Sequence, residues 1–420
     1  DLHQVYRALS VLGKEAGYIQ STLYKNSLKL SSRRTGVIYY DCTNFYFEIE
    51  QEDDPDGLRQ YGHSKENRPN PIVQMGLFMD ADGIPLAFCI NPGNTSEQIT
   101  LVPLEKRLAQ DFSLSGFVVC TDAGLASTAN RSFNDREGRA FITVQSVKTL
   151  KAFQKEWCLD TDGWLLFGDA SRKKYSIKDL DEENDREKTF YKERWFNENG
   201  LEQRMIVTYS LKYRDYLRSL RERHVVRAAK KLAQPSLLKH KRPTDPGRFI
   251  KEDRCTGDGE LAEKAVYSLD EERISEEAKY DGFYAVCTDL EDDAEVIVNI
   301  NQRRWRIEEC FRIMKHEFRA RPAYLSRDER ILAHFMTCFI ALIVYRFLEK
   351  RLGDGYTVEK ITDQLREMNM TKLEGYGYIP SYDRNELTEA LHKSAGFRTD
   401  QEIIPIAKMR NICKNTKSHG

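Results

Sequence analysis

Two aspartates occupy positions in this chain where a carboxylate is costly. Asp41 lies inside the segment 37–48, whose β-branched and aromatic residues predict a long strand. Asp122 ends the short apolar segment 117–122, which is typical of a buried central strand. An acid in such a segment costs free energy unless it is paired, caps a turn or binds a metal. Either aspartate alone is more simply a turn acid, but two on neighbouring central strands favour a functional role.

The segments around the two aspartates predict an ordered series of elements. Residues 73–79 and 84–90 predict two strands joined by a short turn. A helix capped by Thr95 or Ser96 is expected to run to about Asp111, so the first 125 residues read β-β-β-α-β. This is the element order of the front half of an RNase H-like fold. The residues by themselves predict an α/β protein with a mixed sheet flanked by helices.

A third acid lies on a helix that is expected from about Ala294 to Phe318. It belongs to a polar stripe at helical spacing, formed by Asn301, Arg304, Glu308, Arg312 and Lys315. Taken alone, this stripe is the face of an ordinary amphipathic helix with Arg304–Glu308 and Glu308–Arg312 ion pairs. Together with the two aspartates, the stripe can also be interpreted as part of a metal site. Three carboxylates on two strands and a helix can hold two Mg²⁺ ions for phosphodiester chemistry, and basic groups beside them can hold phosphates.

Composition argues against several classes of protein. Lys and Arg number 65 and Asp and Glu 66, so any nucleic-acid surface must be local. The nine cysteines are odd in number and lack C-x-x-C spacing, which predicts free thiols in a reducing compartment. The longest apolar stretch, 335–345, is too short to span a bilayer, so we expect a cytoplasmic protein without a membrane partner. Gly-rich phosphate loops and serine-hydrolase motifs are absent from the sequence, which predicts no nucleotide cofactor.

The length accommodates one large domain with an insertion, or two domains. Residues 127–280 alternate short apolar runs with charged segments, and the stretch 221–251 holds ten Lys or Arg against two acids. We predict a helical lead-in at 1–34, core parts at 35–126 and 281–350, an insertion at 127–280 and a helical tail at 351–420. Because the chain begins with an aspartate rather than a methionine, we also expect residues upstream.

Taken in order, these motifs resemble the bacterial insertion-sequence transposases of the Asp-Asp-Glu (DDE) type. The chain is most similar to the group whose third motif reads Tyr-x2-Arg-x3-Glu-x6-Lys, which Arg304, Glu308 and Lys315 match. Asn301 stands at the tyrosine position, a departure that concerns a DNA contact and not the metal ligands. The resemblance covers roughly residues 35–350. The other segments of this chain that resemble the family lie at 40–47, 118–124, 62–65, 68–69, 83–86, 92–97, 281–283, 321–324 and 330–334.

The resemblance implies an RNase H-like core interrupted before its last helix by a mainly β insertion domain. It implies Mg²⁺-dependent cleavage at the element's ends and strand transfer into target DNA, with Mn²⁺ able to substitute for Mg²⁺. The partners implied are double-stranded DNA, as terminal inverted repeats and target, and a second copy of the chain in a homodimer. Carried over, Asp41, Asp122 and Glu308 would be the catalytic metal ligands. The DNA-binding candidates are Arg304, Lys315, Arg312, Lys65 and Arg68, and an upstream DNA-binding region is implied as well.

Two other functions stay open. A nuclease on the same fold would cut DNA without joining it, although the Arg304–Lys315 pairing and the insertion favour end binding and transfer. A non-catalytic DNA-binding relic is expected to have lost an acid, and all three are present. The insertion tryptophans are candidates for holding a flipped base, although core packing is simpler for each. These are Trp157, Trp164 and Trp195. The basic stretch is equally well explained as solvated surface or as a surface that tracks DNA.

Overall fold

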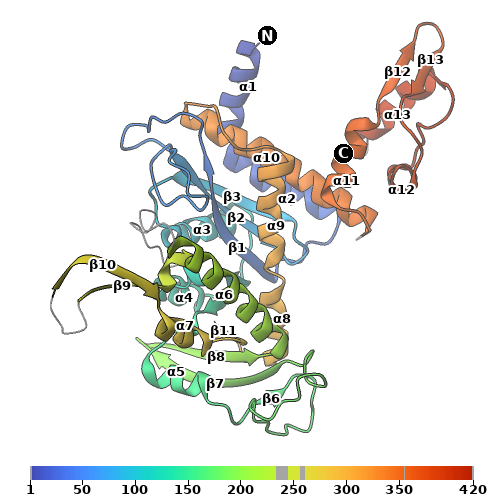
Figure 1. Cartoon of the computed structure of the whole chain (residues 1–420). Coiled ribbons are helices and arrows are strands. Elements are labelled where there is room, and N and C mark those ends of the chain that lie inside the picture. The colour runs from blue at the N-terminus through green and yellow to red at the C-terminus, as the bar shows by residue number, and fades with distance from the viewer. Residues whose placement is uncertain (1, 233–244, 256–260, 354, 419–420) are drawn as a thin grey trace. The chain divides into compact units, whose positions relative to one another are not determined.

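The computed structural model describes residues 2–232, 245–255, 261–353 and 355–418 (Figure 1). The chain forms two compact units. Unit 1 consists of Asp1–Phe117 and Arg303–Gly420, and unit 2 consists of Val118–Gln302. The protein is α/β, with a mixed sheet flanked by helices, as predicted, and this arrangement is consistent with the expected RNase H-like fold.

Three antiparallel strands form the sheet of unit 1, in the order β3-β2-β1. They are β1 (Val37–Tyr46), β2 (Ile72–Asp80) and β3 (Pro85–Pro92). The first two are buried along almost their whole length, so apolar residues occur on both of their faces. The Tyr40 hydroxyl reaches Thr100 at 2.7 Å, and a Cβ at Gly76 would lie 2.1 Å from that hydroxyl oxygen. Gly76 therefore makes room for a buried tyrosine next to Asp41.

Helices cover this sheet. Unit 1 contains α1 (Leu2–Lys14), α2 (Ala16–Leu30), α3 (Leu101–Asp111), α9 (Trp305–Arg312), α10 (Asp328–Leu352), α11 (Val358–Glu367), α12 (Glu386–Ala395) and α13 (Ile406–Ser418). The C-terminal residues, predicted as a helical tail, also form a small sheet of β12 (Met370–Leu373), β13 (Gly377–Pro380) and β14 (Ile404–Pro405). By length and composition α10 could cross a membrane, but 56% of its most apolar window is buried inside the protein. The rings of Phe335 and Phe339 pack on Phe45 and Phe88, as in the core helix of a globular protein.

A six-stranded mixed sheet forms the centre of unit 2, in the order β4-β5-β11-β8-β7-β6. Only β4 and β5 are parallel, and the remaining neighbours are antiparallel. The strands are β4 (Val118–Thr121), β5 (Ala140–Gln145), β6 (Leu165–Leu166), β7 (Phe190–Glu198), β8 (Leu201–Tyr209) and β11 (Phe283–Thr288). Trp164 is fully buried in the core of this unit, Trp157 packs against that core, and Trp195 is 40% exposed.

The insertion contains helices as well as strands. Unit 2 holds α4 (Thr128–Asn134), α5 (Ala152–Leu159), α6 (Leu211–Leu232), α7 (Glu271–Ala278), α8 (Ala294–Gln302) and a ribbon of β9 (Ile250–Cys255) and β10 (Leu261–Leu269). The first part of the predicted basic stretch is thus the C-terminal half of α6. Residues 233–244 of that stretch lie outside the described residues.

The predicted helix from Ala294 to Phe318 is not continuous, and that prediction was wrong. α8 ends at Gln302, α9 begins at Trp305, and a π-helical turn follows at Ile313–Glu317. The two helices have different partners. The Asn301 amide in α8 donates to the Tyr284 hydroxyl at 2.7 Å, whereas Arg306 in α9 donates to the carbonyl of Asp82 at 2.7 Å.

The cysteines agree with the prediction of free thiols. All eight whose side chains the structure describes are free. The predicted thiol of Cys255 lies outside the described side chains. Burial raises the pKa of the Cys42 and Cys158 thiols to about 12, so these two are inert packing groups at neutral pH.

Candidate active site

Asp41 lies in the middle of β1, opposite Leu77 of β2. Its side chain is only 11% exposed, and one carboxylate oxygen accepts a 2.8 Å hydrogen bond from the backbone N–H of Cys42. The other carboxylate oxygen lies 3.9 Å from the guanidinium of Arg304. A nearly buried acid on a central strand is therefore held by a backbone donor and by a neighbouring positive charge, as the cost of burial requires.

Glu308 lies one helical turn after Arg304, and its carboxylate is 3.4 Å from the same guanidinium. Arg304 thus lies within ion-pair distance of two of the three predicted acids. The side chain of Glu308 is 60% exposed, whereas that of Arg304 is 19% exposed. Within unit 1 the structure brings Asp41, Arg304 and Glu308 together.

Lys315 lies in the π-helical turn and reaches the strand that carries Asp41. Its ammonium group donates to the Thr43 hydroxyl at 2.7 Å, and it lies 3.3 Å from the Glu66 carboxylate. Thr43 is two residues after Asp41, so both side chains are on the same face of β1. Burial, together with the positive charge of Lys65, lowers the pKa of Lys315 to about 8. The ammonium group is thus held in a place that suits an anionic partner.

If the chain binds DNA, as the resemblance implies, the lowered pKa of Lys315 predicts that this binding depends on pH. Lys315 is charged below about pH 8, and the unfolded chain, with a pKa near 10.5, keeps its proton longer. A bound phosphate stabilises the ammonium form, so above about pH 8 binding must take up a proton and weakens as the pH rises. We expect metal-free affinity for duplex DNA to fall between about pH 7 and about pH 9. The Lys315→Arg variant stays charged, so its affinity for DNA should no longer fall over this pH range. If the affinity of that variant fell with pH as in the parent protein, Lys315 would not be the group responsible.

Lys65 and Glu66 lie close to β1, the strand that carries Asp41. The Lys65 ammonium donates to the backbone carbonyl of Cys42 at 2.6 Å and pairs with Glu97 at 2.8 Å. Burial alone would lower the pKa of Lys65, but the hydrogen bond and charge of Glu97 raise it. Glu66 pairs with both Lys315 and Arg321. Sequence reasoning did not single out Glu66 or Thr43, although Glu66 directly follows one family-like segment and Arg321 begins another.

The remaining DNA-binding candidates have other partners. The guanidinium of Arg68 lies over the Tyr46 ring at 4.8 Å. Arg312 is 55% exposed and lies 3.5 Å from Glu309, so the predicted Glu308–Arg312 pair is replaced by a pair with the neighbouring acid. Asn301 is 3% exposed inside unit 2, where its amide is bonded to Tyr284. The predicted stripe therefore does not lie along one helix face.

Asp122 directly follows β4 in unit 2. It caps the short 3-10 turn Ala123–Leu125, because one carboxylate oxygen accepts from the backbone N–H of Leu125 at 3.1 Å. The Thr143 hydroxyl donates to its backbone carbonyl at 3.2 Å. The turn-acid alternative for Asp122 thus has direct geometric support. Because the cap uses a single oxygen, it is compatible with further coordination.

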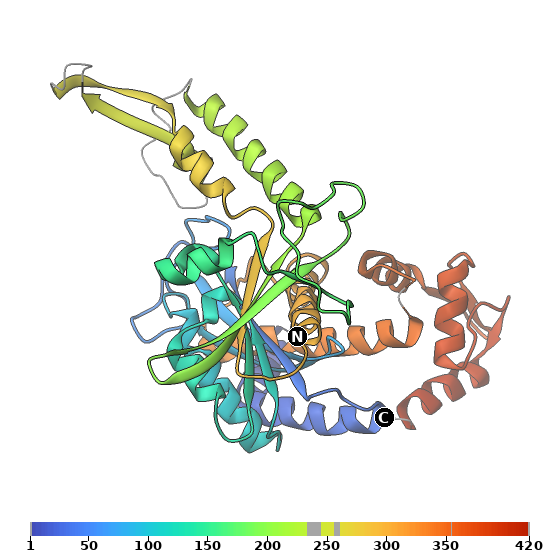
Figure 2. The same ribbon diagram turned by 90° about the horizontal axis from the view of Figure 1, so that it is seen from below.

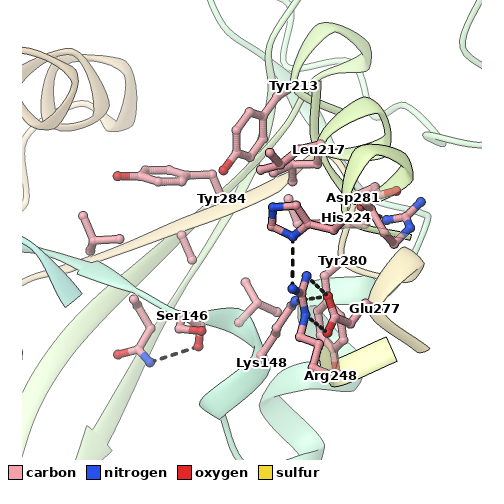
Figure 3. Close-up of a pocket in the computed structure, with 17 residues that line it drawn as sticks. Ser146, Lys148, Tyr213, Leu217, His224, Arg248, Glu277, Tyr280, Asp281 and Tyr284 are labelled. Carbon is pink, nitrogen blue, oxygen red and sulfur yellow. Dashed lines mark hydrogen bonds and ion pairs between the residues drawn. The ribbon is translucent and has the colours of Figure 1, made fainter. Parts of the chain in front are cut away.

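A pocket of about 340 Å³ lies in unit 2 between α6, α7, β5 and β11 (Figure 3). Its charged groups are largely paired with one another. Arg248 binds Glu277 at 3.0 Å and the His224 ring at 3.0 Å, and Arg221 binds Asp281 at 2.5 Å. None of the three predicted acids lines it, so we do not assign the catalytic chemistry to this pocket.

The donor atoms in unit 1 suit a hard divalent cation. The oxygens of Asp41 and Glu308 flank a position already held by positive charge, and carboxylate oxygens are the ligands that Mg²⁺ prefers. Over the described residues, no three His, Cys, Asp or Glu side chains form a metal-binding group. Unit 1 by itself therefore offers two carboxylates of appropriate chemistry.

Comparison with known proteins identifies the family. A model of the transposase DDE domain matches residues 47–344, so the chain belongs to that family. The matched range includes Asp122, Arg304, Glu308 and Lys315 and begins after Asp41.

One solved structure with a similar chain is the piggyBac transposase synaptic complex with hairpin DNA. It is 8% identical, with a TM-score of 0.32, over 81% of this chain and 59% of that chain. The present chain thus spans about three-fifths of that protein's length. No curated protein matches this sequence.

Proposed function

We propose that this chain cleaves DNA at the ends of a mobile element and joins those ends to target DNA, using divalent metal ions. The observation that carries the proposal is the position of Arg304 within ion-pair distance of both Asp41 and Glu308, together with the hydrogen bond from Lys315 to Thr43, which shares a face of β1 with Asp41. Membership of the DDE transposase family supports the same reaction class. We propose Mg²⁺ as the ion, with Mn²⁺ as a substitute.

In this proposal Asp41, Asp122 and Glu308 hold two metal ions. The ions would activate a water or a 3′-hydroxyl and stabilise the leaving oxygen of an in-line displacement. Arg304 and Lys315 bind the phosphates beside the reacting bond, where their charges offset those of the DNA. Arg304 lies within ion-pair distance of both carboxylates, and a DNA phosphate would be a further anionic partner for its guanidinium.

The proposed partners are double-stranded DNA, as terminal repeats and target, and a second copy of this chain in a homodimer that pairs two ends. Arg68, Arg312 and Lys65 would extend the contact with the DNA backbone. Lys65 also positions the strand that carries Asp41, through its hydrogen bond to the carbonyl of Cys42.

The proposal is tested by incubating the protein with a labelled DNA fragment that carries the element end and with a target plasmid. We expect Mg²⁺ to support cleavage and joining, and EDTA to abolish both. Glu308→Gln should reduce cleavage by about 10²–10³-fold or more, because a ligand charge is lost where transition-state charge develops. The matched control is Glu359→Gln, the same change at an exposed glutamate of α11, which should leave the rate unchanged.

The alternatives give different products in the same assay. A nuclease cuts the labelled end without forming a joined plasmid, and that result would replace the transposase by the nuclease. A non-catalytic relic binds the end and cuts nothing in Mg²⁺ or Mn²⁺. Equal cleavage by the Glu308 and Glu359 variants would remove Glu308 from the metal site.

A further inference from the structure

Helix α6 carries a concentration of positive charge that the proposed active site does not use. Its 22 residues include eight Lys or Arg and two acids, a surplus of six, in a chain whose overall charge is −1. The helix lies in unit 2 beside the β9–β10 ribbon (Figures 1 and 2).

The inner face of α6 is structural. Tyr213, Leu217 and His224 point into the pocket of Figure 3, and Ala228 is buried against Phe249. The cations toward this side are matched by acids of unit 2. Arg214 pairs with Glu182 and Asp215, Arg221 with Asp281, and Lys231 with Asp245.

The outer face is different. Arg223, Arg227 and Lys230 follow one another at i, i+4 and i+7, so they share one exposed face, on which Tyr216 is 57% exposed. Among the described residues, the ion pairs of α6 are made by other cations, and the Arg223 guanidinium donates only to a backbone carbonyl, that of Ser219 at 3.4 Å. Like charges at i, i+3 and i, i+4 repel one another and destabilise a helix. An anion bound on this face would offset that repulsion. A full helix of this length spans about 33 Å, close to one turn of B-DNA at roughly 34 Å.

We propose that the outer face of α6, formed by Arg223, Arg227 and Lys230, binds the phosphate backbone of double-stranded DNA. The partner is a polyanion because the face is a row of exposed cations outside the ion pairs that α6 makes among the described residues, and it is DNA because the proposed function acts on DNA. The contact carries no base specificity. The inference rests on the proposed function for the identity of the nucleic acid, but it needs no catalysis.

The test measures binding of the full chain to a mixed-sequence duplex of roughly 30 base pairs, about three helical turns, as salt is varied. The triple variant Arg223→Gln, Arg227→Gln, Lys230→Gln should bind about tenfold or more weaker at low salt. Its salt slope should be shallower by about 2–3, because each lost phosphate contact removes about 0.9 from the slope.

Two controls sharpen the result. The triple variant Lys360→Gln, Lys372→Gln, Lys393→Gln makes the same charge change at exposed positions of the C-terminal residues, and it should keep the parent slope. The charge-conserving variant Arg223→Lys, Arg227→Lys should also keep the parent slope, because the slope depends on the number of charges that meet phosphates. Unchanged thermal unfolding verifies that each variant is folded.

The inference would be overturned if the α6 variant had the same salt slope as the parent protein. It would also be overturned if the C-terminal control lost as much of the slope as the α6 variant. A shallower salt slope in the charge-conserving variant would also overturn it, because that variant keeps every charge to which the slope is assigned. The outcome is separate from that of the proposed function. If the parent protein binds DNA through α6 but never cuts it, the α6 surface stands and the proposed transposase reaction is wrong. If the parent protein cuts and joins DNA but the α6 variant binds normally, the proposed reaction stands and the α6 surface is wrong.

Discussion

Replacing Asp122 by asparagine is expected to abolish DNA cleavage while leaving the stability of the protein almost unchanged. Asparagine caps helices and turns about as well as aspartate, so the hydrogen bond from the Leu125 N–H can persist. The substitution removes only the negative charge. If Asp122 is a metal ligand, the loss in cleavage rate should be about 10²–10³-fold or more. If it is only a turn acid, the rate should not change.

The matched control is Asp270→Asn. Asp270 also caps a helix in unit 2, accepting from the backbone N–H of Arg273 at 3.0 Å, and it belongs to no proposed site. We expect both variants to unfold in urea within about 0.5 kcal/mol of the parent. We expect only the Asp122 variant to lose cleavage of labelled element ends in Mg²⁺. Full activity of that variant would leave Asp122 with its structural role alone.

The largest expected loss of stability comes from a buried ion pair at the start of unit 1. Arg33 binds the Asp80 carboxylate at 2.5 Å, and both side chains are at most 1% exposed. Arg33 also donates to the carbonyls of Ile84 and Pro85, at 3.0 Å each. Burial raises the pKa of Asp80 even with the guanidinium beside it, so the carboxylate depends on this partner. Arg33→Ala should cost about 3–5 kcal/mol, because it leaves an unpaired buried charge.

Arg34 provides the control for this prediction. It is the next residue and also pairs with an aspartate, Asp82 at 3.4 Å, but its side chain is 59% exposed. Exposed pairs contribute little, so Arg34→Ala should cost about 0–1 kcal/mol. The free energies of unfolding in urea, followed by circular dichroism, compare the two variants. Equal costs would show that burial is not what makes the Arg33 pair important.

Local patterns were sufficient to predict the strand that carries Asp41 and the closeness of Arg304 to Glu308. The strand around Asp41 follows from its β-branched and aromatic residues, and β1 extends from Val37 to Tyr46. The Arg304–Glu308 pair follows from helical spacing, and the two side chains lie 3.4 Å apart. In both cases the signal is confined to neighbouring residues, which is why one sequence contains it.

Contacts between distant segments were not predictable in the same way. Helical spacing extends the polar stripe from Asn301 to Lys315, but Asn301 is held by Tyr284 in unit 2, and the helix stops after Gln302. Nothing local indicates that Lys315 reaches Thr43 or that Glu66 joins Lys315 to Arg321. These contacts depend on tertiary packing, which overrides the helical period.

The π-helical turn at Ile313–Glu317 has a consequence for how this chain tolerates insertions and deletions. Its backbone closes through the Phe318 N–H to the Ile313 carbonyl at 3.1 Å, five residues apart instead of four, so one extra residue is accommodated in the turn. Removing a residue upstream of Lys315 within the turn would restore the regular α-helical repeat and rotate Lys315 by about 100° around the axis, away from Thr43. The number of residues between Glu308 and Lys315 therefore sets the direction in which Lys315 points around the helix axis. A change in the length of this segment would displace the ammonium group even if every side chain were retained.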